Sequence, residues 1–148
     1  LVGNELLEMP VLYLSRYIIK NKSEYYRLLH EVCTKNNWEE WVLFILLGIQ
    51  YTSIQSIILI KSIKALMGEY KTKIRSELPK IYSQDLLNLL FRHPYTKIEY
   101  VMKDLKVSRI TATKYLNQLT EIRLLTKHKL GRNIYFVNDS LFDLFVKK

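Results

Sequence analysis

Short polar and basic side chains gather between Val107 and Thr120, a stretch that contains no acidic residue. Hydroxyls and amides can hydrogen-bond to base edges or phosphates, arginine can bind guanine, and lysine neutralises phosphate charge. A charge run is usually only a solvated helix face, but such faces commonly carry Glu beside Lys. The absence of acids therefore favours a face that binds the major groove of double-stranded DNA. The candidate contacts are Ser108, Arg109, Thr111, Thr113, Lys114 and Asn117.

A second basic group follows on a predicted β-hairpin. Two β-type runs, residues 126–130 and 134–137, flank the turn sequence Gly131-Arg132-Asn133, a pattern typical of hairpins. On such a hairpin, cations would contact phosphates or the minor groove of DNA. The candidate contacts are Lys127, Lys129 and Arg132.

Three capped helices are expected to position these two groups. Ser83, Thr96 and Ser108 each precede apolar residues at helical spacing and are suitable N-caps. Ala112 is small where two helices of a tight turn would cross. Three helices followed directly by a hairpin predict a winged helix-turn-helix over residues 79–148. That fold alone does not establish DNA binding, because winged helices also serve as protein-docking or dimerisation domains.

The net charge of +9 is distributed unevenly. Residues 1–78 contain ten Lys/Arg and eight Asp/Glu, whereas residues 79–148 contain thirteen and six. Between Lys106 and Arg132 seven bases accompany one acid, Glu121. A basic excess confined to one motif indicates a polyanionic partner better than a basic average would.

The first half, residues 1–78, is predicted to be helical. One helix is expected to begin near Ser23 as N-cap, and another at Trp38. Trp38, Trp41, Val42, Ile45 and Leu46 are spaced to form one wide core face of that second helix.

A long linking helix is expected to end at Leu78-Pro79, where the domain boundary is placed. It carries an apolar seam of Ile63, Met67, Tyr70, Ile74 and Leu78. The seam could pack on the preceding helices, the favoured interpretation, or on a second copy of the chain.

Other chemistries find little support in the sequence. The single cysteine, Cys33, is interpreted as a small buried hydrophobe, and the three histidines lack partners at zinc-ligand spacing. There is no glycine-rich phosphate loop and no nucleophile elbow. The longest apolar run, residues 42–49, is short for a membrane span, and no secretory signal opens the chain. A cytoplasmic protein with no membrane partner is expected.

Three segments of the first half resemble Fic-family proteins. Residues 6–17 resemble the segment that follows the family's active-site motif, Tyr25-Tyr26-Arg27-Leu28-Leu29 its paired-tyrosine helix, and Trp38-Glu39-Glu40-Trp41 its tryptophan-containing helix. Many bacterial members continue, as this chain does, with a long linking helix and a winged helix. The resemblance implies a parent enzyme that transfers AMP to protein hydroxyls with ATP and Mg²⁺.

The family's catalytic signature, His-Pro-Phe followed closely by Gly-Asn-Gly-Arg, is not found in this sequence. His93-Pro94-Tyr95 mimics its start, but Thr96 and Lys97 follow where the glycine loop should stand. By resemblance, the chain is a C-terminal remainder with no catalytic residue and no cofactor of its own. We therefore expect a mainly α protein whose winged helix binds DNA in a regulatory or targeting role. The alternative is a protein-docking or homodimerisation module.

Overall fold

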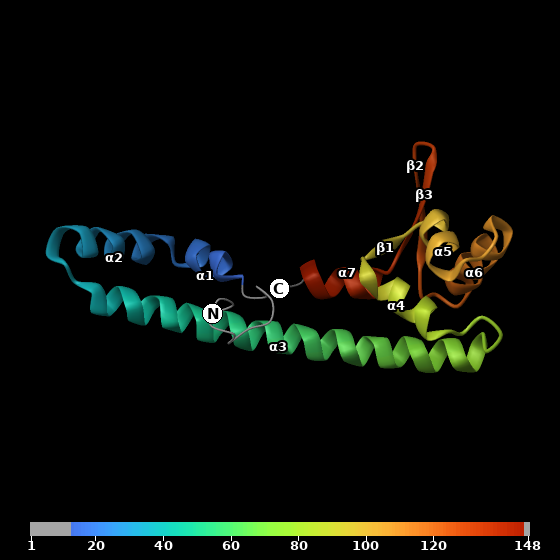
Figure 1. Ribbon diagram of the computed structural model, residues 1–148, viewed down its shortest axis with the longest axis horizontal. Coiled ribbons are helices and arrows are strands. Elements are labelled where there is room, and N and C mark those ends of the chain that lie inside the picture. The colour runs from blue at the N-terminus through green and yellow to red at the C-terminus, as the bar shows by residue number, and fades with distance from the viewer. Residues whose placement is uncertain (1–12, 147–148) are drawn as a thin grey trace. The chain divides into compact units, whose positions relative to one another are not determined.

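The computed structural model describes residues 13–146 (Figure 1). It shows a mainly helical chain with one small antiparallel sheet, and the predicted fold class is confirmed. The chain divides into two compact units, one that ends at Ile60 and one that begins at Lys61. The part of the Fic-like segment that precedes Tyr13 lies outside the described residues.

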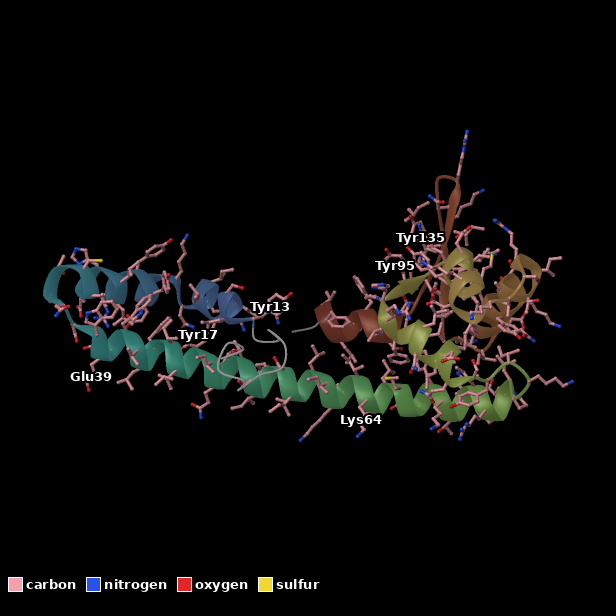
Figure 2. The ribbon with its side chains drawn as sticks, in the orientation of Figure 1. Tyr13, Tyr17, Glu39, Lys64, Tyr95 and Tyr135 are labelled. Carbon is pink, nitrogen blue, oxygen red and sulfur yellow. The ribbon has the colours of Figure 1, made fainter. Side chains whose placement is uncertain are left out.

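The first unit contains α1 (Leu14–Lys20), α2 (Lys22–Lys35) and the beginning of α3 (Trp38–Glu77). Its core is small and largely aromatic. The ring of Tyr17 lies 5.2 Å from that of Phe44, and Figure 2 shows Tyr17 between α1 and α3. A Cβ at Gly48 would lie only 2.7 Å from the Tyr17 ring. Glycine at this position therefore lets α1 approach α3 closely.

Charged side chains join α2 to α3 at the surface of this unit. Arg27 donates to Glu24, to Glu31 and, across the helix pair, to Glu40 at 3.1 Å. The hydrogen bond from Arg27 lowers the pKa of the Glu24 carboxyl. Because Arg27, Glu24 and Glu40 are exposed, the network orients the helices more than it stabilises them.

Several expectations for the first unit are wrong in detail. Helix α2 begins two residues earlier than expected, and its N-cap is Asn21, without a side-chain cap, instead of Ser23. Cys33 is exposed, not buried. Of the predicted wide core face, Trp41 and Ile45 are half-buried, whereas the exposed members are Trp38, Val42 and Leu46. The residues do recur at helical spacing, but other described residues shield only Trp41 and Ile45 from solvent.

Helix α3 is continuous over 40 residues and takes part in both units. Among the described residues it is the one helix long and apolar enough to cross a membrane. The apolar run 42–49 is short by itself, but the helix stays apolar over a longer stretch. Length and composition alone are weak support for a span, since core helices of soluble proteins also satisfy them. Four residues of the seam pack in the core of the second unit, with the winged helix that follows: Tyr70 and Ile74 are buried there, and Met67 and Leu78 pack against them.

The second unit has the order of elements of a winged helix-turn-helix. The end of α3 is followed by α4 (Gln84–Arg92), β1 (Tyr95–Thr96), α5 (Ile98–Leu105), α6 (Arg109–Glu121), β2 (Thr126–Leu130), β3 (Asn133–Val137) and α7 (Asp139–Val146). The strands lie in the order β1-β3-β2, and β2 with β3 forms the projecting hairpin in Figure 1. Gly131 has φ +61° at the first central position of the two-residue turn, where such hairpins favour glycine.

Two of the three predicted caps are confirmed. Ser83 accepts a hydrogen bond from the Leu86 amide, and Ser108 accepts one from the Thr111 amide. The prediction for Thr96 is wrong: this residue lies in β1, the N-cap of α5 is Lys97, and the Thr96 hydroxyl has no partner among the described residues. Thr96 is held in the strand because it pairs with Phe136 of β3, a contact that local sequence does not reveal.

A buried polar cluster joins the elements of the second unit. The Tyr70 hydroxyl of α3 lies 2.8 Å from Leu124 O and 2.7 Å from Asn138 Oδ1, and these two acceptors share its single proton. The side-chain amide of Asn138 donates to Leu90 O, and Asn138 Oδ1 also accepts from Leu141 N at the start of α7. Buried polar groups are costly unless they are paired. This cluster therefore fixes α3, α4, α7 and the base of the wing in one arrangement.

Tyr70→Phe is expected to lower the free energy of unfolding by about 1–2 kcal/mol, because the buried Leu124 carbonyl loses its side-chain donor. Burial raises the pKa of the Tyr70 hydroxyl. Its contribution is therefore fully present below the ordinary tyrosine pKa and is lost as the pH rises through the folded-state value.

Urea unfolding followed by circular dichroism measures this change. The matched control is Tyr82→Phe, since Tyr82 hydroxyl donates to the exposed Gln84 side chain and should contribute under about 0.5 kcal/mol. Equal losses in the two variants would contradict the role given to the buried cluster.

Candidate nucleic-acid interface

Helices α5 and α6 form the helix-turn-helix, and α6 presents most of the predicted contacts. Lys106 adopts a left-handed backbone conformation, φ 53°, at the end of α5 and so turns the chain. Ala112, Leu116 and Leu119 of α6 are completely buried against the core. Because these three residues fix the rotation of α6, its opposite face must point to solvent.

The outward stripe of α6 contains Ile110, Lys114 and Asn117, spaced by four and three residues. Ile110 is 84% exposed, more than any other large apolar side chain that the structure describes. Lys114 is exposed and Asn117 is half-buried. The sequence analysis selected Lys114 and Asn117 but missed Ile110, because only polar residues were considered as contacts.

The hydroxyl groups predicted to read bases are engaged within α6. Ser108 Oγ and Thr111 Oγ1 lie 2.9 Å apart, and Ser108 Oγ caps the helix. Thr113 Oγ1 donates to the Arg109 carbonyl at 2.8 Å. These hydroxyls hold the first turn of α6 together. Thr113, and whichever of Ser108 and Thr111 donates in their shared hydrogen bond, would have to exchange partners before donating to a base, whereas the remaining hydroxyl keeps its proton.

An acid that the sequence analysis overlooked lies beside the predicted face. Arg109 Nη1 is 3.8 Å from Glu99 Oε1, and both side chains are largely exposed. Glu99 belongs to the first turn of α5, ten positions earlier in the chain. The acid-free stretch of the sequence is therefore not an acid-free surface. The helix-turn-helix itself could have suggested this, because its two helices lie side by side.

The predicted cations of the wing are exposed and lie on one side of it. Lys127 and Lys129 pair with Phe136 and Ile134, so the two lysines share the face of the hairpin on which these apolar residues lie. Arg132 lies in the turn. All nine predicted contacts thus belong to the second unit, six on or beside α6 and three on the wing.

The opposite face of the sheet carries a group that the sequence analysis missed. Tyr95 and Tyr135 have ring centroids 5.6 Å apart. Figure 2 labels the two residues at β1 and β3. Lys97 Nζ lies 4.5 Å from the centre of the Tyr135 ring and 6.0 Å from that of Tyr100. A hydrogen bond with Tyr135 raises the pKa of Lys97. The aromatic rings thus hold a cation at the point where β1 leads into α5.

No group of three or more His, Cys, Asp or Glu side chains that could hold a metal is found among the residues that the structure describes. His93 ends α4 and stacks on Tyr95, and the Pro94 carbonyl accepts from the backbone N–H of Asn138. The His93-Pro94-Tyr95 run therefore joins a helix to a strand.

Fold and order of elements define this part of the chain as a winged helix-turn-helix that follows a long helix. The family model described as protein adenylyltransferase SoFic-like, C-terminal domain, matches residues 66–141. The match begins in α3 and extends into α7, so it includes the buried Tyr70–Asn138 cluster. The chain belongs to this family and carries the C-terminal domain of a Fic-type protein adenylyltransferase.

Glu99→Gln is expected to tighten binding to duplex DNA about two- to fivefold at low salt. The substitution removes a negative charge from beside the predicted DNA-binding face of α6 and frees Arg109 from its ion pair. Fluorescence anisotropy with a labelled duplex measures the change. The matched control is Asp85→Asn, which removes the same charge from the first turn of α4. Weaker binding by Glu99→Gln, or an equal gain in the control, would show that Glu99 does not adjoin the bound DNA.

Proposed function

We propose that the second unit binds double-stranded DNA and serves as the regulatory or targeting region of a Fic-type protein adenylyltransferase. The observation that carries the proposal is the exposed basic face of α6, which lies in the same compact unit as a basic wing. In this arrangement α6 would enter the major groove, and the wing would contact the neighbouring phosphates.

Electrostatics supports the proposal in the same part of the chain. Lys114, Lys127, Lys129 and Arg132 are exposed, and the ion pair of Arg109 with Glu99 is long and solvent-exposed. Such a pair costs little to break. Cations of this kind release counterions from DNA when they neutralise phosphates, which makes binding strongly dependent on salt.

Binding to a random-sequence 30-bp duplex should weaken steeply as salt rises from 50 to 200 mM. Lys114→Ala and Arg109→Ala should each weaken it severalfold and reduce the slope of log affinity against log salt by about 1, because each removes one phosphate contact. Anisotropy titrations at four salt concentrations measure the slope.

Lys64→Ala is the matched control for this prediction. Lys64 is an exposed lysine of α3 in the same unit, and Figure 2 shows its side chain pointing away from the winged helix. This variant should keep the slope of the unaltered chain. Absence of binding to any duplex at 50 mM salt, or an equal effect of all three substitutions, would refute the proposal.

A protein-docking function is the second candidate, and one observation favours it. Large apolar side chains along the first part of α3 are exposed in the described residues, among them Leu43, Leu47, Ile54, Ile57 and Ile58. Contiguous exposed apolar surface commonly marks an interaction site. Sedimentation of the chain over a range of concentrations, with and without duplex DNA, separates the candidates. A monomer that binds duplex DNA supports the first candidate, and a dimer that does not bind DNA supports the second.

A further inference from the structure

We propose that Ile110 is a base-reading residue whose side chain contacts the 5-methyl group of thymine in the major groove. The inference rests on the proposed function and adds a sequence preference to it. Thymine is the one base that presents a methyl group in that groove, and apolar side chains are the groups that recognise it.

Exposure alone would not carry this inference, since single apolar residues are common on protein surfaces. The position of Ile110 is what distinguishes it. It follows Ser108, the N-cap of α6, by two residues and lies one turn before Lys114 on the outward stripe. In helix-turn-helix proteins, the N-terminal residues of the second helix are those that reach base edges.

Nothing in the fold explains an isoleucine at this position. At 84% exposure its side chain contributes little to the core of the second unit. As a β-branched residue, it also favours a helix less than Ala, Leu or Lys would. A contact outside the chain gives this side chain a role that its packing does not.

The remainder of the stripe also suits A·T pairs. Asn117 lies seven residues after Ile110, two helical turns along the same face. Asparagine binds adenine through two hydrogen bonds in the major groove, and adenine is the partner of thymine. Lys114, between them on the stripe, would neutralise a phosphate. Together these side chains predict a preference for A·T pairs.

The β-branched shape of isoleucine suits a fixed contact. In a helix its first side-chain torsion has one strongly preferred rotamer, so little conformational entropy is lost when a methyl group packs against it. The first turn of α6 is itself held by the Ser108 cap and by the Thr113 hydrogen bond to the Arg109 carbonyl. Ile110 is thus presented on a rigid turn.

Deoxyuridine, which is thymine without its methyl group, provides the test. A tight-binding duplex is first selected from a random 30-bp pool with the full chain, and each thymine is then replaced singly by deoxyuridine. Binding by the unaltered chain should weaken about fourfold at one or two positions, the equivalent of one methyl group left in water. In Ile110→Ala the same replacements should have no effect.

Leu130→Ala is the matched control, because Leu130 is a second large apolar residue, 66% exposed, on the wing. This variant should keep the full sensitivity to deoxyuridine. If the unaltered chain binds the thymine and deoxyuridine duplexes equally, the inference is wrong while DNA binding stands. Undiminished sensitivity in Ile110→Ala also overturns it. Failure to select any duplex overturns both the inference and the proposed function.

Discussion

The second unit depends on one buried hydroxyl. Tyr70 comes from the long helix, and its acceptors are Leu124, just after α6, and Asn138, between the wing and α7. Asn138 in turn caps α7 and reaches α4 through the Leu90 carbonyl. Leaving a buried polar group unpaired destabilises the fold by more free energy than its hydrogen bond contributes. Arrangements of these elements that break the cluster are therefore unfavourable. The orientation of α6 relative to the wing follows from that constraint.

This constraint explains why the matched family domain begins inside a helix. Residues 66–141 include the last turns of α3, and those turns supply Tyr70 and Ile74 to the core of the winged helix. A unit cut at Pro79 would lack both residues. The linking helix is thus part of the domain that it introduces, and its apolar seam is used within the chain.

Local sequence patterns predicted much of the fold but not its long-range contacts. The caps Ser83 and Ser108 and the Gly131 turn follow from residues close to one another in sequence, and they are confirmed. Strand β1 is only two residues long and forms by pairing with β3, some forty residues later, so the signal at Thr96 was read as a cap. Helix α7 was not predicted either, although Asn138 caps it locally by accepting from Leu141 N.

The sequence predicted which side chains belong to the candidate site better than it predicted which residues lie beside them. Sequence selected the cations correctly as exposed groups, yet it missed Glu99 beside Arg109 because the two residues meet only when α5 and α6 pack. It also missed the Tyr95–Lys97–Tyr135 group, which the sheet assembles. Ile110 was overlooked for a different reason: only polar residues were considered as contacts, and its exposure is what shows that it is not a core residue.

The most direct test of the central claim is the location of the DNA-binding face. A duplex of random sequence is titrated into the ¹⁵N-labelled full chain at 50 mM salt, and backbone amide shifts are followed by NMR. We expect the largest shifts at residues 108–117 and 127–132. Shifts concentrated on the exposed apolar residues of α3, or no shifts at all, would contradict it.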